Sequence, residues 1–323
     1  MGSDPKVERA PFDPAALRAS LVPLAFDAVP SSAHDAYLTH YGIDFHKRSG
    51  DIRHSLGIVK TERHDVCVHL WTPADATGTA VVIHGYYDHV GLYGHLIQHL
   101  LRRKLAVLAF DLPGHGLSSG PPATIETFDH YVAAFNETLA ATKAQLPKPW
   151  HLIGQSTGGA VAMEWLLANR FTKANAPFDA IVLLAPLVRP YAWAPFNRIV
   201  YEIARRFITE RPRTFVTNAD NEEFILFLRD RDPLQARILP VQWVTAMQKW
   251  RRRFERYPAT DLEPLVIQGR ADRTIDRKYN IKVIERLFRP RVVYIDDARH
   301  HLVNESPAIR TRMFAAIDAA LIQ

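Results

Sequence analysis

The serine at position 156 stands in a pattern that is typical of a nucleophile. Residues 154–158 read Gly-Gln-Ser-Thr-Gly; an apolar run at 150–153 precedes them, and small residues of helical character follow at 159–162. A serine between two glycines at a strand-to-helix turn has a strained backbone and an exposed hydroxyl, and the N–H groups of the helix point to the same place. The pattern predicts that Ser156 attacks a carbonyl carbon.

A serine nucleophile needs a base, and the base needs an acid that orients it. Enzymes that carry the serine on such a turn supply these groups in the chain order serine, acid, histidine, each after a later strand. Asp272 follows the apolar run at 264–268 and is the predicted acid. Asp276 is an alternative, but it directly precedes a helical pattern over 277–288 and fits better as the residue that caps this helix.

The predicted base is a histidine after the next strand. An apolar run at 291–295 is followed by Asp-Asp-Ala-Arg-His-His, so His300 and His301 both lie where the base is expected. The spacing alone leaves the two histidines open. The aspartates at 296 and 297 are interpreted as loop residues.

Two backbone N–H groups are expected to stabilise the oxyanion that forms in such a reaction. One belongs to the residue after the nucleophile, Thr157, and the other to a loop after an early strand. The run at 80–83 ends in His-Gly-Tyr-Tyr-Asp-His, which makes Tyr86 the second predicted donor. Gly85 has no Cβ, so the backbone can approach the substrate closely there.

Alternating strands and helices must position these residues. Residues 58–71 alternate between apolar and polar side chains, as in half-buried antiparallel strands; shorter, wholly apolar runs follow, as expected inside a covered parallel sheet. These runs lie at 80–83, 105–110, 151–153, 181–185, 265–267 and 292–295. Helical patterns occur at 92–103, 127–144, 158–169, 277–288 and 307–322. The sequence therefore predicts an α/β fold with a doubly wound, mostly parallel sheet that binds ligands at the carboxyl ends of its strands.

A long stretch before residue 265 shows helical periodicity and no strand signal, most clearly as an amphipathic pattern at 197–209. We interpret it as a helical cap that is inserted before the strand carrying the acid. The predicted organisation is an extended lead-in at 1–30, a core at 31–185 and 261–323, and the cap at 186–260. Large apolar side chains of the cap are candidates to line an acyl-chain channel: Trp193, Phe196, Phe207, Phe224, Leu226 and Phe227.

Together these segments resemble the serine hydrolases of the α/β-hydrolase fold that include monoacylglycerol lipases, bacterial lysophospholipases and serine aminopeptidase S33-like enzymes. The resemblance runs from about residue 80 to the end, with a gap across most of the cap, and rests on residues 84–89, 111–118, 154–158, 232–234, 269–272 and 299–305. In this family the catalytic histidine lies five residues before a glutamate, which assigns that role to His300. Gln155 and Thr157 replace the family's usual His and Met, and Tyr86 is bulkier than its usual small residue. The resemblance therefore implies the chemistry more firmly than the substrate pocket.

Composition and the remaining motifs exclude other classes of protein. The chain has 47% apolar and 23% charged residues, as an ordinary globular protein does, and its net charge of +6 is interpreted as a solubilising surface. The single cysteine, Cys67, has no intramolecular partner, and no apolar run has the length of a membrane span or forms a signal-peptide core. We therefore expect a cytoplasmic protein.

We expect no cofactor, no metal ion and no nucleic acid. The glycines at 114–120 are followed by prolines rather than by a helix, so they do not match a dinucleotide site. His95 and His99 are one helical turn apart but have no carboxylate between them. The basic run at 251–253 stands alone, without a nucleic-acid-binding motif.

The sequence thus predicts a carboxylic ester hydrolase that uses Ser156, Asp272 and His300 and forms an acyl-enzyme. The resemblance implies a monoacylglycerol, a lysophospholipid or a similar medium-chain ester as substrate. The basic run at 251–253, near Trp243 and Trp250, is interpreted as a solvated helix face, with transient contact between the cap and a membrane surface as the alternative. An aminopeptidase or a carbon–carbon bond hydrolase with the same triad is an alternative, and so is a ligand-binding receptor with negligible turnover. The sequence does not indicate an oligomeric state.

Overall fold

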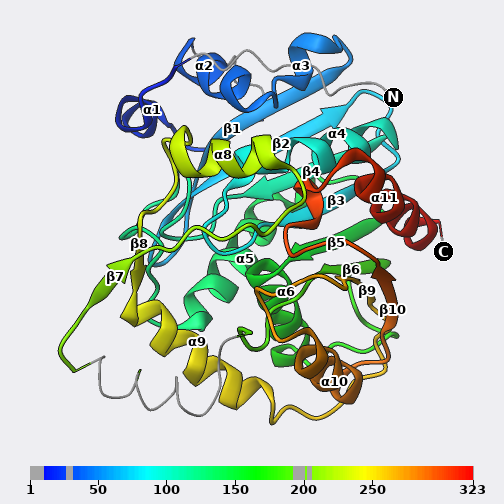
Figure 1. Ribbon diagram of the computed structural model, residues 1–323. Helices are drawn as coiled ribbons and strands as arrows, with labels where there is room; N and C mark the ends of the chain where they lie inside the picture. The colour runs from blue at the N-terminus through cyan, green and yellow to red at the C-terminus, as the bar shows by residue number, and fades with distance from the viewer. Residues whose placement is uncertain (1–10, 27–31, 192–200, 202–205, 323) are drawn as a thin grey trace.

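An eight-stranded sheet runs through the centre of the computed structural model, which describes residues 11–26, 32–191, 201 and 206–322 (Figure 1). The strands are β1 Ile52–Lys60, β2 Asp65–Pro73, β3 Gly78–Ile83, β4 Leu105–Phe110, β5 Trp150–Gln155, β6 Ala180–Leu184, β9 Leu265–Gly269 and β10 Arg291–Ile295. Their order in the sheet is β1-β2-β4-β3-β5-β6-β9-β10. Strand β2 is antiparallel to both neighbours, and every other neighbouring pair is parallel. The predicted α/β fold with a doubly wound, mostly parallel sheet is confirmed.

Helices cover both faces of the sheet (Figure 1). Helices α4 (Gly94–Arg102) and α11 (Pro307–Leu321) pack together on one face, where His99 Nε2 lies 2.8 Å from Asp318 Oδ1. Helices α5 (Phe128–Thr142) and α6 (Thr157–Ala168) pack together on the other. Strands β3 to β6 therefore lie between two layers, which explains why their runs are apolar on both sides. Among the described residues, no helix combines the length and apolar character needed to cross a bilayer.

The register of the parallel strands brings the predicted site residues to one edge of the sheet. Strand β5 ends at Gln155, which aligns with Leu184 of β6. Strand β9 ends at Gly269, which aligns with Ile295 of β10. Because parallel strands end at the same edge, the loops that follow β5, β9 and β10 converge there. Helix α10 (Arg277–Leu287) follows the acid loop and begins at Asp276, whose Oδ1 accepts a hydrogen bond from Tyr279 N (3.2 Å), as predicted.

The prediction of an extended lead-in at residues 1–30 is wrong for its central part. Helix α1 (Pro14–Ser20) forms there because Asp13 Oδ1 accepts a hydrogen bond from Ala15 N (2.8 Å), Pro14 presets the backbone, and Leu17 is buried. Residues 1–10 and 27–31 lie outside the described residues. Helices α2 (Ser32–Tyr41) and α3 (Phe45–Arg48) follow before β1.

The described residues between β6 and β9, which we call the cap segment, contain helices α8 (Glu222–Asp230) and α9 (Val241–Phe254). They also contain an antiparallel pair of short strands, β7 (Glu210–Pro212) and β8 (Ile238–Pro240), where the sequence predicted no strand. Strands of three residues are too short to show an alternating pattern. The helix predicted at 197–209 lies mostly outside the described residues, and residues 206–209 are not helical. The boundaries of the cap at 186 and 260 stay predictions.

Candidate active site

Ser156 lies on a sharp turn between β5 and α6. Its φ of 50° and ψ of −111° are unusual for a residue with a side chain, and its backbone N–H donates to Leu184 O (2.9 Å) on the neighbouring strand. The two glycines of the motif are required by close packing. A Cβ on Gly154 would lie 2.6 Å from Gly158 O, and a Cβ on Gly158 would lie 2.1 Å from Ile83 O. The turn predicted from the sequence is thus present, with the serine at its tip.

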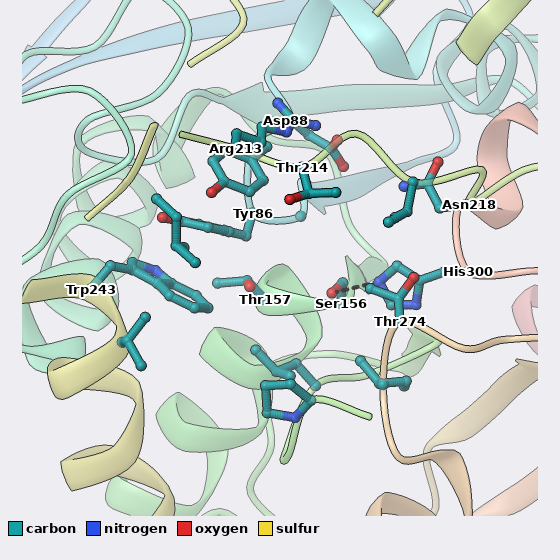
Figure 2. Close-up of a pocket in the computed structure, with 18 of the residues that line it drawn as sticks. Tyr86, Asp88, Ser156, Thr157, Arg213, Thr214, Asn218, Trp243, Thr274 and His300 are labelled. Atoms are coloured by element: carbon teal, nitrogen blue, oxygen red, sulfur yellow. Dashed lines mark hydrogen bonds between the residues drawn. The ribbon is translucent and has the colours of Figure 1, made fainter. Parts of the chain in front are cut away.

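The structure brings Ser156, His300 and Asp272 together in that order. Figure 2 shows the contact between Ser156 and His300. His300 Nε2 lies 2.9 Å from Ser156 Oγ, and His300 Nδ1 lies 2.8 Å from Asp272 Oδ2. A neutral His300 with its proton on Nδ1 donates to Asp272 and accepts from the serine hydroxyl. This geometry is the arrangement in which a histidine can take the serine proton.

Asp272 is completely buried and held by three further donors. Its Oδ1 accepts hydrogen bonds from Thr274 N (2.8 Å) and Ile275 N (3.3 Å), and its Oδ2 accepts one from Gln268 Nε2 (3.0 Å). Burial alone would raise the pKa of Asp272, but the charge and hydrogen bond of His300, together with the other donors, bring the pKa below its ordinary value. Asp272 therefore stays ionised.

The pKa of His300 shifts in the opposite direction. Burial lowers the pKa of the imidazole, but the Asp272 carboxylate raises it by more, through its charge and its hydrogen bond, so the pKa lies above the ordinary 6.5. The imidazolium that forms when His300 takes a proton is thereby stabilised. His300 is therefore suited to act as a general base, with Asp272 holding its imidazole in position.

A loop of the cap segment holds the histidine loop in place. The carbonyl oxygen of Asn218 accepts hydrogen bonds from His300 N (3.0 Å) and His301 N (2.8 Å). Glu305 accepts bonds from the N–H groups of Arg299 and Asp220, so it joins the same two loops. Figure 2 shows Asn218 beside His300. No pattern in the sequence marks this connection, because the partners are far apart in the chain.

The two predicted oxyanion donors lie beside Ser156. Thr157 is the first residue of α6, so its N–H has no acceptor within the helix. Gly85 precedes Tyr86, and a Cβ on Gly85 would lie 3.4 Å from Ser156 Cβ, which places this loop directly against the nucleophile. In the hydrogen bonds of the described residues, neither the N–H of Tyr86 nor that of Thr157 has an acceptor. Both are therefore available to an oxyanion.

A buried network fixes the loop that carries Tyr86, and reasoning from sequence missed it. Gly85 N donates to Tyr93 Oη (2.9 Å), and the Tyr93 hydroxyl donates to Asp88 Oδ2 (2.8 Å). The other oxygen of Asp88 lies 3.0 Å from His301 Nε2. His301, the alternative base, therefore has its own carboxylate partner and does not contact the serine. The pKa of Asp88 lies well below its ordinary range, because His301 and Tyr93 outweigh the effect of burial.

The cap segment is attached to the same loop by Asp232, in the segment 232–234 that the sequence comparison singled out. Asp232 is buried; its Oδ2 lies 3.0 Å from His89 Nε2, and its Oδ1 accepts from the Tyr41 hydroxyl (2.7 Å). Gln235 Nε2 donates to Asp232 Oδ2 (2.9 Å) and to Tyr87 O (3.0 Å). The cap segment, α2 and the loop after β3 are thus joined in one polar cluster.

A cavity of about 670 Å³ opens over Ser156, between the strand ends and the cap segment (Figure 2). Its described lining is mostly apolar, and Asp88 is the one carboxylate within it. Tyr86 and Trp243 stack in its wall, with ring centroids 3.7 Å apart. Two arginines, Arg211 and Arg213, also line it.

Of the six side chains named as candidates to line an acyl channel, the four that the structure describes do not line the cavity. Phe207 is 81% exposed, Phe224 packs against His301 and Phe227 packs against Tyr41. Trp193 and Phe196 lie outside the described residues, and the exposed Leu226 does not reach the cavity. The cap segment instead contributes Ile208, Phe215, Ile225, Leu228, Val244 and Met247. Helix α8 presents a different face from the one expected.

The motifs that the sequence set aside have structural roles. The turn at 111–118 is held by Asp111, whose oxygens accept from Val90 N (2.8 Å) and Leu117 N (2.7 Å). His99 pairs with Asp318 rather than with His95. Within the described residues, no group of three or more His, Cys, Asp or Glu side chains is arranged to hold a metal ion.

Comparison with known proteins agrees with this geometry. The family described as "Serine aminopeptidase, S33" matches residues 74–307. Human monoglyceride lipase is 25% identical over 265 residues, which cover 77% of this chain and 84% of the human protein. An uncharacterized abhydrolase domain-containing protein of Dictyostelium discoideum is 28% identical over 134 residues, which cover 41% of this chain but only 14% of that protein. The crystal structure of a soluble variant of monoglyceride lipase from Saccharomyces cerevisiae superimposes with a TM-score of 0.68 at 16% identity, over 82% of this chain and 92% of the yeast chain.

Proposed function

Because the chain belongs to the serine aminopeptidase S33 family of α/β-hydrolases, we propose that it is a serine hydrolase that cleaves carboxylic esters through an acyl-enzyme intermediate. The observation that carries the proposal is the continuous chain of hydrogen bonds from Ser156 through His300 to Asp272 at the base of an apolar cavity. The similarity to monoglyceride lipases supports an acyl ester of glycerol, or a related medium-chain ester, as the substrate.

The proposed mechanism follows from the positions of these groups. His300 Nε2 takes the proton of the Ser156 hydroxyl as its oxygen attacks the ester carbonyl, and Asp272 stabilises the resulting imidazolium. The N–H groups of Tyr86 and Thr157 bind the oxyanion. His300 then returns the proton to the leaving alcohol, and a water molecule releases the acid by the same steps in the second half-reaction.

The charges in the cavity favour an ester over an aminopeptidase substrate. An enzyme that binds a free amine needs a carboxylate to hold it, and Asp88 is the one carboxylate in the described lining. Both oxygens of Asp88 are already bonded, to His301 and to Tyr93. Arg211 and Arg213 would also repel a positive charge. The complete triad argues against a receptor with negligible turnover.

The test compares the native protein with Ser156→Ala on p-nitrophenyl acetate, butyrate, octanoate and palmitate. We expect release of p-nitrophenol by the native protein and a loss of at least about 10⁴-fold in the variant, because the nucleophile is gone. The preferred chain length measures how much of the cavity an acyl chain fills. Native protein that is folded but turns over none of these esters would refute the proposal.

A further inference from the structure

The cavity carries positive charge on the wall formed by the cap segment. Arg211 lies in β7 and Arg213 directly follows this strand, and both line the cavity. Figure 2 shows Arg213 next to Tyr86 and Thr214, in the wall above Ser156. A neutral monoacylglycerol has no group that would use this charge.

Arg213 is held in a fixed orientation. Its guanidinium lies over the ring of Tyr87, 3.9 Å from the centroid, and over the ring of Phe215, 4.3 Å from the centroid. Its Nη1 donates to Gln235 Oε1 and to Ala236 O (3.3 Å). Because Gln235 is itself bonded to Asp232 and Tyr87 O, the position of the guanidinium is set by the buried cluster that attaches the cap segment.

The remaining donors of Arg213 have no partner in the part of the chain that the structure describes. Its Nε and Nη2 carry three N–H groups, and none of them donates to a described residue. Neither Arg213 nor Arg211 forms an ion pair with a described carboxylate. Asp88 lies in the same wall, but its oxygens are bonded to His301 and Tyr93. An oriented, partly buried guanidinium with free donors is the group that proteins use to bind carboxylates and phosphates.

We propose that the cavity selects esters that carry an anionic group, a carboxylate or a phosphate, and that Arg213 is the residue that recognises it, with Arg211 as a weaker second contact. This inference rests on the proposed ester hydrolysis and adds to it the class of substrate. An anion there would complete the hydrogen bonding of a cation that is already partly buried and positioned, whereas a neutral ester would leave its charge without a counter-ion.

The alternative is that Arg213 is purely structural, holding the segment before β8 through Gln235 and Ala236 and supporting the ring of Tyr87. A structural role would affect neutral and anionic substrates equally, because Tyr87 is adjacent to the oxyanion donor Tyr86. Selective recognition would affect the anionic substrate far more. The ratio of the two specificity constants therefore separates these roles.

The experiment uses two matched pairs of esters. Monoethyl glutarate and ethyl pentanoate differ by a carboxylate in the acyl half, and 1-butyrylglycerol 3-phosphate and 1-butyrylglycerol differ by a phosphate in the alcohol half. We expect the native protein to prefer the anionic member of one pair. Arg213→Gln should lower kcat/KM for that member by about 10- to 100-fold, chiefly through KM, and for its neutral partner by less than about 3-fold. The pair that responds identifies the anion as carboxylate or phosphate.

Arg237→Gln is the matched control. Arg237 also lies over the Phe215 ring, 5.2 Å from the centroid, but it does not line the cavity. Its substitution should leave the ratio between anionic and neutral esters unchanged, and Arg213→Lys should restore only part of the preference, because an ammonium cannot form two parallel hydrogen bonds. An equal loss for both members of each pair, or no anion preference in the native protein, would overturn the inference while leaving ester hydrolysis intact.

A binding measurement separates this inference from the proposed function. If no ester of either pair is hydrolysed, the proposed function fails, and calorimetry of the Ser156→Ala protein with glutarate and with glycerol 3-phosphate decides the anion site. Binding that disappears in Ser156→Ala/Arg213→Gln would support an anion site at Arg213. Absence of binding by both anions would overturn it.

Discussion

Two parts of the cap segment line the same cavity but are attached to the molecule in different ways. The first, which we call the floor, is helix α9, and it contributes Trp243, Val244 and Met247 to the lining. The second, which we call the rim, is the stretch 206–216, and it contributes Ile208, Arg213 and Phe215, among others. The floor is buried against the core, whereas most of the rim is exposed.

The floor is anchored by a buried carboxylate of the core. Glu164 of α6 is 2% exposed and accepts hydrogen bonds from Trp250 Nε1 (2.9 Å), Arg253 Nη2 (2.7 Å) and Tyr257 Oη (3.0 Å). The ring of Trp250 also stacks on Phe128 of α5, with centroids 4.4 Å apart. The basic run at 251–253, which the sequence set aside as a solvated face, thus supplies part of the anchor.

Among the described residues, the rim has no comparable anchor. It is joined to the rest of the cap segment by the short β7–β8 pair and by the bonds of Arg213, while Phe207 and Val216 are 81% and 56% exposed. The difference indicates that the floor and the rim have different roles. The floor supports Tyr86 through the stack on Trp243, whereas the rim forms an exposed part of the cavity lining, and substitutions there are expected to leave the core folded.

The largest expected effect on the free energy of unfolding comes from a change in pH, because it protonates histidines that are buried in the core rather than residues of the rim. Burial lowers the pKa of His69 and of His84 to about 3 and that of His115 to about 4. The described rim contains no histidine. In the unfolded chain these histidines take up protons near pH 6.5, so below that value the unfolded state binds more protons than the folded one. The contribution of these histidines to the free energy of unfolding is therefore fully present above pH 6.5. It falls as the pH drops toward their pKa values in the folded protein, by up to about 1.4 kcal/mol per pH unit for each histidine.

We expect the urea midpoint, followed by tryptophan fluorescence, to fall steeply from pH 7 to pH 5, and activity to respond at higher pH than the fold. His300 must be neutral to act as a base, and its pKa lies above 6.5. Hydrolysis therefore decreases as the pH falls through that raised pKa, before the buried histidines unfold the protein. A urea midpoint that does not change between pH 7 and pH 5 would contradict this prediction.

The second prediction tests the contacts that anchor the floor. Glu164→Ala leaves Trp250, Arg253 and Tyr257 without their acceptor, and we expect it to lower the free energy of unfolding by about 3 kcal/mol, measured by urea denaturation. Asp129→Ala is the matched control, because Asp129 binds the same Arg253 but is exposed. Its substitution should cost less than about 1 kcal/mol. Equal losses for the two variants would show that the buried contacts do not anchor the floor.

Local patterns were enough to predict the sheet and the triad. Strands β4 and β6 are uninterrupted apolar runs, and the glycines around Ser156 are required by contacts within the turn and with the adjacent strand β3. His300 lies 144 residues from Ser156; the chain order of the fold led to the pair His300 and His301, and the family resemblance selected His300. These features could be predicted because each depends on a short segment or on the order of such segments.

The features that could not be predicted depend on contacts between distant segments. The hydroxyl of Tyr87 donates to Ile238 O across 151 residues, and Asp88 meets His301 across 213 residues. No period in the sequence marks such pairs. The same reason explains the error at α8, where Ile225 and Leu228 rather than Phe224 and Phe227 face the cavity. Its apolar residues surround much of the helix, so the pattern did not identify the face that packs on the core.

The smallest expected effect on the free energy of unfolding comes from substitutions in the rim. They test how the rim differs from the floor. We propose that the exposed apolar side chains of the rim insert into a lipid surface when the protein takes its substrate from a membrane. Phe207 and Val216 are exposed next to the arginines of the rim, a combination suited to an anionic bilayer. Phe207→Ser/Val216→Ser should change the free energy of unfolding by less than about 0.5 kcal/mol, because neither side chain is buried.

The same double variant should bind anionic phospholipid vesicles at least about 10-fold more weakly in sedimentation, since insertion of even one large apolar side chain contributes about 1.5–3 kcal/mol. Ile322→Ser is the control, because Ile322 is 85% exposed on the described C-terminal end, outside the cavity lining. It should leave vesicle binding unchanged. If the rim variant binds as the native protein does, the rim has no part in lipid contact; if it unfolds at a lower urea concentration, the rim is packed more firmly than the contrast with the floor implies.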